Sequence, residues 1–355
     1  MKREETKTIH VGPVAIGGSA PVSVQSMCNT KTENVAATLA QIAALEAAGC
    51  DIVRLAVPDE AAARALPAIR AGTKMPLVAD IHFDYRLALA AADAGFDAIR
   101  INPGNIGSAE RVRAVADACR TNGIPIRVGV NSGSIPKDLL AQYGASPAAL
   151  VASALRHVHI LEELHFDDIC VSLKSSSVPY TVEAYRRMAK AVPYPLHLGV
   201  TEAGTPYMGT IKSAAGIGAL LLDGIGGTIR VSLTADPLEE VRAGIALLKA
   251  VGLRQGGVNI ISCPTCGRTS IDLIALANDV EKRLAHVQKP LTVAVMGCVV
   301  NGPGEAREAD YGLAGGNGEG ILFKKGEVVA KVPEANLAAA LCDLIAKEEG
   351  AEIFQ

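Results

Sequence analysis

The stretch that decides the fold is residues 51–81, which read DIVRLAVPDEAAARALPAIRAGTKMPLVADI. Two apolar segments, Asp51–Val57 and Pro76–Ile81, flank an alanine-rich segment that closes at Gly72. Apolar runs of this length are typical of parallel strands buried on both faces, and a glycine commonly ends a helix. The stretch therefore predicts a strand, a helix and a second, parallel strand.

The same unit recurs on both sides of this stretch. The predicted strands are Val22–Met27, Asp51–Val57, Pro76–Ile81, Ala98–Pro103, Pro125–Asn131, Asp168–Lys174, Pro195–Glu202 and Thr228–Leu233. Eight strand–helix units predict an N-terminal (β/α)8 barrel, the TIM barrel of the α/β class. We disfavour an open doubly wound sheet because no G-x-G-x-x-G follows the first strand. Ile9–Gly18 predicts a small hairpin that plugs one end of the barrel.

A smaller α+β domain is predicted after the glycine-rich joint Gly252–Gly257, so that residues 1–253 form the barrel and 254–355 the second domain. Its predicted elements are a strand into Cys263, a helix from Asp272 to about His286, a strand into Cys298, a loop over Gly302–Gly320, a hairpin over Ile321–Val332 and a last helix over Glu334–Glu348. The loop is predicted because its glycine density is too high for a packed element.

The composition argues against several classes of partner. The chain has 355 residues, a formal net charge of -3, 3% aromatic residues and no Trp, which is a poor fit for nucleic-acid binding. No apolar run is long enough to cross a bilayer, so no membrane partner is expected. Eight cysteines without a secretory signal predict a cytoplasmic protein with reduced thiols.

Three of the cysteines form a metal-ligand pattern. Cys263 and Cys266 are spaced C-x-x-C, and Cys298 ends a distant apolar run. Three thiolates without a nearby His favour an iron–sulfur cluster whose fourth ligand is a hard, weaker group, for which Glu305 is the nearest candidate. Structural zinc remains an alternative. A disulfide and a thioredoxin-like motif are disfavoured, since the first needs an oxidising compartment and the second has no use for Cys298.

Basic residues recur inside the predicted barrel strands. Five different strands carry Arg54, Arg100, Arg127, Lys174 and Arg230. A single buried Arg is most often a structural ion pair, but five cations that converge on one barrel mouth favour a highly anionic small molecule such as a diphosphate.

Other polar residues lie near the same strand ends. Glu202 is the best general-acid candidate, and its alternative role is an ion pair with Arg230 or Lys174. Asp80 and His82 either orient substrate hydroxyls or brace the arginines. The remaining candidate substrate contacts are Asn102, Asn131, His197 and Ser232. His197 also fits a hydrogen-bonded core residue.

Seven segments resemble the family of 4-hydroxy-3-methylbut-2-enyl diphosphate synthases, the iron–sulfur reductive dehydroxylases of the methylerythritol phosphate route to isoprenoids. These segments are VQSMCN (24–29), IRINPGN (99–105), RVGVNSGS (127–134), SLKS (172–175), GVTEAG (199–204), SCPTCGRT (262–269) and GCVVNGPGE (297–305). The resemblance covers essentially the whole chain and points to the short bacterial form of the family.

The resemblance implies a barrel followed by a domain similar to the iron–sulfur domain of sulfite and nitrite reductases. A four-iron four-sulfur cluster would be held by Cys263, Cys266, Cys298 and Glu305. The diphosphate of 2-C-methyl-D-erythritol 2,4-cyclodiphosphate would be bound by Arg54, Arg100, Arg127, Asn131, Lys174, Arg230 and Ser232. Glu202 matches the active-site acid of the family.

The resemblance also implies partners. We expect a homodimer in which the cluster domain of one chain closes over the barrel of the other, with ferredoxin or flavodoxin as electron donor. Two other classes fit parts of the sequence. One is a zinc-stabilised aldolase with Lys174 as a Schiff base, and the other is a non-catalytic iron–sulfur regulator, which would leave the barrel cations without a use.

Overall fold

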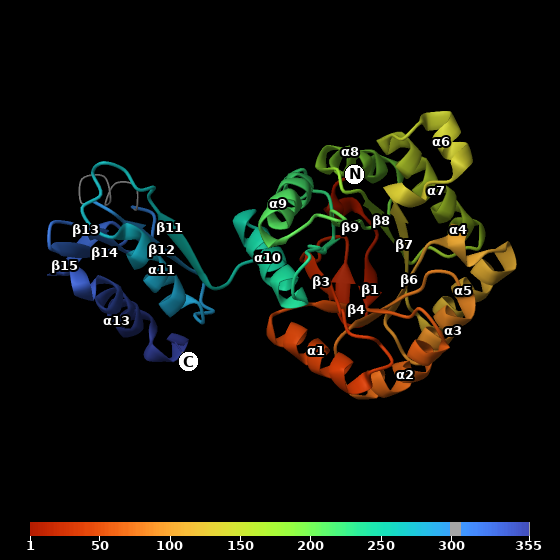
Figure 1. The fold of residues 1–355 in the computed structure, drawn as a ribbon, viewed down its shortest axis with the longest axis horizontal. Coiled ribbons are helices and arrows are strands. Elements are labelled where there is room, and N and C mark those ends of the chain that lie inside the picture. The colour runs from red at the N-terminus through yellow and green to blue at the C-terminus, as the bar shows by residue number, and fades with distance from the viewer. Residues whose placement is uncertain (299–306, 355) are drawn as a thin grey trace. The chain divides into compact units, whose positions relative to one another are not determined.

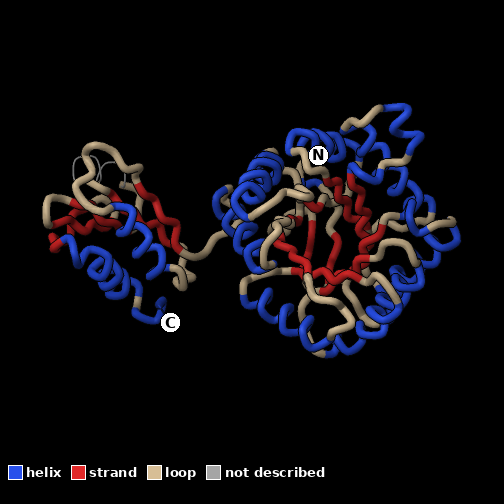
Figure 2. Tube along the Cα trace, in the orientation of Figure 1, coloured by secondary structure: helices blue, strands red, loops and turns tan. Residues whose placement is uncertain are grey.

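The computed structural model describes residues 1–298 and 307–354 of the chain. The chain divides into two units, Met1–Arg254 and Gln255–Gln355, drawn as a ribbon in Figure 1 and by secondary structure in Figure 2. Each unit has a hydrophobic core of its own, as expected of an independent domain.

Parallel strands form the centre of the first unit, as Figure 2 shows in red. They are β3 (Ser23–Met27), β4 (Ile52–Ala56), β5 (Leu77–Asp80), β6 (Ala98–Ile101), β7 (Ile126–Asn131), β8 (Ile169–Lys174), β9 (His197–Leu198) and β10 (Thr228–Ile229). Their order in the sheet is β8-β7-β6-β5-β4-β3-β10-β9, and an isolated parallel bridge between Val171 and Leu196 joins the two outer strands. The predicted TIM barrel is confirmed.

The last two strands are shorter than the apolar pattern predicts. β9 and β10 have two residues each, whereas the sequence favours strands over Pro195–Glu202 and Thr228–Leu233. The first of these cannot extend to its predicted end because Glu202 has a φ of 51°, which lies in the left-handed region outside the strand conformation.

A buried tyrosine links β8 and β9 where the ladder between them is sparse. The Tyr185 hydroxyl donates to the His197 carbonyl oxygen at 2.5 Å and accepts from the Leu173 amide at 3.1 Å. Both backbone groups are buried, so the hydroxyl satisfies groups that would otherwise be costly to leave unpaired.

Helices cover the outside of the barrel, as Figure 2 shows in blue. The larger ones are α1 (Val35–Ala47), α2 (Glu60–Ala71), α3 (Tyr85–Asp93), α5 (Ala109–Asn122), α7 (Pro147–Glu163), α8 (Val178–Ala191), α9 (Pro206–Leu222) and α10 (Pro237–Ala250). The side chains of Asn34, Asp59 and Ser146 accept backbone N–H groups at the starts of α1, α2 and α7, which fixes those boundaries.

Two short helices are not predicted by the sequence pattern. They are α4 (Pro103–Ile106) and α6 (Lys137–Tyr143). Neither is long enough to show a clear helical repeat of apolar residues.

The floor of the barrel is covered by the predicted hairpin. Strands β1 (Ile9–Val11) and β2 (Val14–Ile16) pair antiparallel. Their buried side chains form one apolar cluster with residues at the starts of four barrel strands, namely Ile52, Val78, Ala98 and Cys170. The hairpin therefore closes the amino-terminal end of the barrel.

The second unit is built on one mixed sheet. Its strands, in spatial as well as chain order, are β11 (Val258–Ser262), β12 (Leu291–Met296), β13 (Tyr311–Gly315), β14 (Glu319–Lys324) and β15 (Glu327–Pro333). The first three are parallel, and β14 and β15 form the predicted hairpin. Two helices, α11 (Leu273–Leu284) and α13 (Leu337–Glu349), pack their buried faces into the core of this unit.

The prediction of a loop over Gly302–Gly320 is wrong for its described later part. β13 is a fully buried strand in the middle of the sheet. A Cβ on Gly312 would lie 2.3 Å from Cζ of Phe323, and one on Gly315 would lie 2.2 Å from Cδ1 of Ile271. The glycines in β13 therefore make room for large neighbouring side chains.

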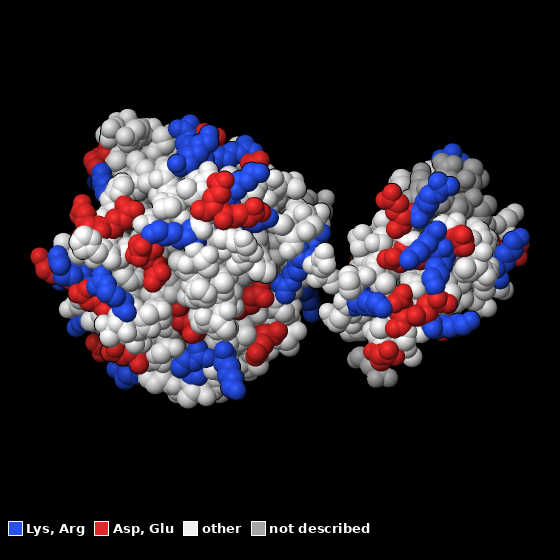
Figure 3. Space-filling view, turned by 180° about the vertical axis from the view of Figure 1, so that it is seen from behind, with Lys and Arg blue, Asp and Glu red and all other residues white. Residues whose placement is uncertain are grey.

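No helix among the described residues is both long and apolar enough to cross a membrane. On the face in Figure 3, acidic and basic side chains are interspersed over each of the two units. Neither sign forms a broad continuous patch over the described residues on that face.

Candidate functional site

Charged side chains come together in the upper part of the barrel. Arg54 lies in β4 and Arg100 in β6, Asp80 and Lys174 end β5 and β8, and Arg230 follows β10. The positive charges of Arg54, Arg100, Arg127 and Arg230 all act on Lys174. The structure therefore brings the five predicted cations into one electrostatic cluster.

Asp80 binds two of these cations. Its Oδ1 accepts from Nη1 of Arg100 at 3.0 Å, and its Oδ2 lies 3.6 Å from Nε of Arg54. Burial opposes ionisation of Asp80, but the charges of Arg54 and Arg100 outweigh it and lower its pKa to about 2. Asp80 therefore stays charged and fixes both guanidinium groups. Met27 Sδ adds a contact to Arg54, 2.8 Å from Nη2.

Arg230 is bound by a carboxylate that the sequence reasoning missed. Nη2 of Arg230 lies 3.3 and 3.2 Å from Oε1 and Oε2 of Glu240, which is on α10 and 4% exposed. The alternative of an ion pair between Glu202 and Arg230 is therefore not what the structure shows. Glu240 could have been suspected, because it falls on the buried face of its helix together with Pro237, Val241 and Gly244.

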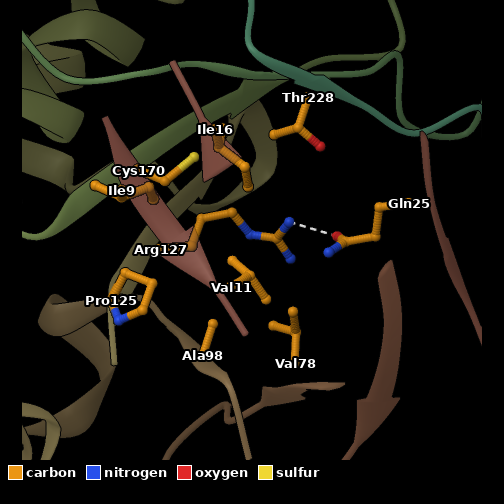
Figure 4. A pocket seen from close by; sticks show the side chains of 10 residues that line it. All are labelled: Ile9, Val11, Ile16, Gln25, Val78, Ala98, Pro125, Arg127, Cys170 and Thr228. Carbon is orange, nitrogen blue, oxygen red and sulfur yellow. Dashed lines mark hydrogen bonds between the residues drawn. The ribbon is translucent and has the colours of Figure 1, made fainter. Parts of the chain in front are cut away.

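Arg127 lies lower in the barrel than the strand-end cations. Its Nη1 donates to Oε1 of Gln25 at 2.5 Å, while Nε and Nη2 are buried without a hydrogen-bond partner among the described residues. Figure 4 shows its guanidinium beside a cavity of about 20 Å³, whose lining includes Thr228 and Cys170. Burial is the main cause that lowers the pKa of Arg127 to about 10. Gln25 was also missed by the sequence reasoning.

Lys174 and His197 show how positive the interior is. Burial, and then the neighbouring cations, lower the pKa of both side chains well below their ordinary values. His197 is therefore a neutral imidazole. Its Nδ1 lies 3.4 Å from Oγ1 of Thr228, and its Nε2 is buried without a partner among the described residues.

Positive charge exceeds negative charge in this cluster. Among the described residues, Arg54 and Arg100 share Asp80, and Arg230 pairs with Glu240, whereas Arg127 and Lys174 have no carboxylate within ion-pair distance. Burying unpaired charge is costly, so the site favours a ligand that carries several negative charges.

The other candidates lie at different depths. Asn102 is buried and Ser232 half-buried, while His82, Asn131 and Glu202 are exposed. Glu202 makes no ion pair among the described residues, and its φ of 51° is uncommon for a residue other than glycine. Backbone strain of this kind is often found at functional sites.

Three of the four cysteines of the second unit follow two neighbouring parallel strands. Ser262 at the end of β11 pairs with Val295 near the end of β12, so Cys263 and Cys298 leave the same edge of the sheet. The Gly297 amide donates to Sγ of Cys263 at 3.2 Å. Cys266 follows in the loop before α11, so the C-x-x-C does not open a helix as a thioredoxin-like motif would.

The thiols suit a soft metal centre in type and position. Hydrogen bonds from the backbone and side chain of Arg268 lower the pKa of Cys266, which favours the thiolate. All eight cysteines are free. The described residues contain no ready group of three His, Cys, Asp or Glu side chains around one point. Cys298 borders residues 299–306, and the predicted ligand Glu305 lies outside the described residues.

The fold and these residues define a class: a TIM-barrel protein with a cation-rich interior, followed by a unit that carries cysteines at one sheet edge. The family model described as "GcpE TIM-barrel domain" matches residues 6–245, and that described as "GcpE protein C-terminal domain" matches residues 259–347. The chain belongs to the GcpE family.

Curated relatives match over nearly the full length. A Geobacter sulfurreducens protein named 4-hydroxy-3-methylbut-2-en-1-yl diphosphate synthase (flavodoxin) is 61% identical over 340 residues, which cover 96% of each chain. A protein of the same name from Symbiobacterium thermophilum is 56% identical and covers 99% of this chain and 95% of its own. The family resemblance seen in the sequence is thereby confirmed.

Among solved structures, the dihydropteroate synthase of Yersinia pestis is similar in fold. Its TM-score is 0.50 at 13% identity, and the match covers 69% of this chain and 97% of that chain. At this identity the likeness shows the barrel fold alone.

Proposed function

We propose that this protein catalyses the two-electron reductive ring opening of 2-C-methyl-D-erythritol 2,4-cyclodiphosphate to 4-hydroxy-3-methylbut-2-enyl diphosphate. Two electrons and a proton enter, the ring bond between carbon and a diphosphate oxygen breaks, and one hydroxyl leaves as water. The observation that carries the proposal is the excess of buried cations in the barrel of a GcpE-family chain. The names of its 56–61% identical relatives support the same reaction.

The diphosphate would be bound by the cluster in the upper barrel. Lys174 and Arg230 would donate to its oxygens, with Ser232 and Asn131 at the rim, and Arg54 and Arg100 would be held in place by Asp80. Arg127 would act from below as a fixed positive charge beside Gln25. Preorganised cations of this kind stabilise negative charge that develops as the diphosphate leaves carbon. Asn102, His82 and His197 complete the proposed substrate contacts.

Glu202 would handle the proton. Its exposed carboxyl group follows β9 and is not engaged by any cation among the described residues. It would donate a proton to the departing hydroxyl oxygen, or orient that hydroxyl. The left-handed backbone of Glu202 supports this role, because strained residues cluster at active sites.

We assign a four-iron four-sulfur cluster to Cys263, Cys266, Cys298 and Glu305. When bound, such a cluster supplies electrons one at a time and an open iron position. The placement of the thiols at one sheet edge supports the assignment. A hard carboxylate such as Glu305 would be the most readily released ligand.

We propose three further properties on the basis of family membership. We propose flavodoxin as the electron donor, since the relatives' names include it; ferredoxin is the alternative. We propose a homodimer in which the cluster domain of one chain closes over the barrel of the other. We also propose a cytoplasmic location, where thiolate ligands remain reduced.

The deciding experiment measures iron, acid-labile sulfide and zinc per chain in protein purified without oxygen. About four irons and four sulfides with little zinc are expected. Turnover of the cyclodiphosphate with a one-electron donor should follow. Stoichiometric zinc without sulfide would contradict the proposal, and trapping of a phosphosugar on Lys174 by borohydride would then identify an aldolase.

A loaded cluster without turnover would point to the iron–sulfur regulator. In that case, reversing the charge of Arg127 would leave function intact, whereas the proposed enzyme would lose substrate binding.

A further inference from the structure

Glu240 is a buried carboxylate at which three parts of the barrel meet. It lies in the first turn of α10 and is 4% exposed. Its Oε2 accepts from Oγ of Ser26 in β3 at 3.2 Å, and its Oε1 accepts from the Leu233 amide at 3.0 Å. Both oxygens also contact the guanidinium group of Arg230.

These contacts lie at a weakly paired seam of the barrel. β10 and β3 pair through two residue pairs only, Thr228–Ser23 and Ile229–Val24. Beyond Ile229 the chain continues through Arg230 and Ser232 to Leu233, where Glu240 binds the backbone. A helix residue thus anchors a segment that carries two proposed substrate contacts.

Glu240 contacts one edge of the Arg230 guanidinium group, formed by Nε and Nη2. It does not contact the third nitrogen, Nη1. Nε and Nη2 of Arg230 face the carboxylate at 3.2–3.3 Å. Nη1 makes no hydrogen bond among the described residues, and the side chain is 16% exposed. A guanidinium group held along one edge can present its remaining donors in a fixed direction.

We propose that Glu240 is a positioning residue, which holds Arg230 and the Leu233 backbone so that Nη1 of Arg230 and Ser232, two residues further along the same segment, meet one oxyanion of the ligand. This inference rests on the proposed function, because it takes the ligand to be a diphosphate. Glu240 itself does not touch the ligand.

A different role for Glu240 predicts the opposite result. If the carboxylate only offset the positive charge of the site, its removal would strengthen the attraction for an anion. If it positions Arg230, its removal weakens binding, because Gln can accept at one terminal atom only and its amide N–H groups face the donors of Arg230.

The experiment is calorimetric titration of inorganic diphosphate into the anaerobic full-length protein. We expect Glu240→Gln to bind at least about tenfold more weakly than the wild type, as for the loss of a charge-assisted hydrogen bond. The matched control is Glu239→Gln, which removes the same charge from the neighbouring position but only breaks the exposed pair with Arg242. Unchanged or tighter binding by Glu240→Gln would overturn the proposal.

A double variant tests whether Glu240 acts through Arg230. In an Arg230→Gln background, adding Glu240→Gln should weaken diphosphate binding little further, since coupled residues are not additive. An additional full loss would contradict the proposal. Glu240→Asp, which keeps the charge with a shorter reach, should bind with intermediate affinity and serves if the Gln variant folds poorly.

Turnover separates this inference from the proposed function. With the cyclodiphosphate, Glu240→Gln should raise KM while kcat changes little, because the lost contact holds the substrate in the ground state as well. Failure of the wild type to turn over the cyclodiphosphate would overturn the function, yet the diphosphate titrations would still decide the role of Glu240. Absence of diphosphate binding by the wild type would overturn the role of Glu240, while turnover of the cyclodiphosphate would still decide the function.

Discussion

Asp80 stabilises two arginines at once, in a position that is 3% exposed. Removing one partner of a buried ion pair commonly costs 3–5 kcal/mol. We expect Asp80→Asn to lower the free energy of unfolding by about 3 kcal/mol at neutral pH. Urea denaturation followed by circular dichroism measures this, since the chain has no Trp.

The effect of Asp80 should depend on pH in a defined direction. Its folded-state pKa, about 2, lies below the ordinary value of 3.8. Its contribution is therefore fully present above the ordinary pKa and is lost as pH falls toward 2, so the wild type and Asp80→Asn should converge there. The control is Asp84→Asn, which breaks an exposed pair with Arg86 and leaves an Asn that can still cap α3. Equal losses in both variants would contradict the prediction.

Lys174 should take up a proton when an anion binds. Burial and neighbouring cations lower its pKa in the free protein, and a diphosphate would raise it again. Affinity for inorganic diphosphate should therefore fall as pH rises. Calorimetry in two buffers of different ionisation enthalpy should show net proton uptake. In Lys174→Arg, which stays protonated, binding without uptake is expected; undiminished uptake would assign the proton to another group.

The sequence predicted the cations of the site better than their partners. Arg54, Arg100 and Lys174 could be recognised because charge inside an apolar strand is unusual. Glu240 was harder to identify, because it lies on a helix, where a Glu is ordinarily solvent-exposed. The depth of Arg127 could be read from its place near the start of the predicted strand Pro125–Asn131, whereas its contact with Gln25 on another strand could not.

Among the elements, the glycines of β13 carry the clearest stability prediction. A Cβ at position 312 would meet Phe323 and also lie 2.8 Å from the carbonyl oxygen of Ala294, which cannot move independently of β12. We expect Gly312→Ala to destabilise the second unit by about 2 kcal/mol, as overpacking does. Gly267→Ala, with no atom within 4 Å of the added Cβ, should change stability by less than about 0.5 kcal/mol. Similar values for the two variants would contradict this account.

The elements that the sequence predicted well are those with strong local signals. The apolar runs of β4 to β8 and the capped helices between them come from residues adjacent in the chain. β13 was missed because its glycines reflect Phe323 and Ile271, which approach from elsewhere in the fold. The end of β9 was overextended because the backbone turn at Glu202 leaves no mark on the apolar pattern.

For the whole molecule, the proposed dimer predicts complementation between two inactive variants. On the proposed assignments, Lys174→Met would disable the barrel site and Cys298→Ser would disable the cluster site. If each cluster domain serves the partner's barrel, a mixed dimer contains one intact site, and an equal mixture should regain up to about a quarter of wild-type activity. Activity is measured after the chains are dissociated and reassociated together without oxygen.

The control for complementation is each variant carried through the same procedure alone. A mixture that stays as inactive as its components would contradict exchange between subunits. A fully active wild-type monomer, identified by sedimentation at dilution, would contradict the dimer itself.

The hairpin of β1 and β2 covers one end of the barrel, so a ligand can approach the charged cluster from the opposite end. Its packing against Ile52, Val78 and Ala98 blocks passage through the floor. In the proposed reaction, substrate and product would both enter and leave at the opposite end of the barrel, and the cations there would attract both, since each carries a diphosphate. Product release would then contribute to the turnover time, and accumulated product would compete with fresh substrate for the same site.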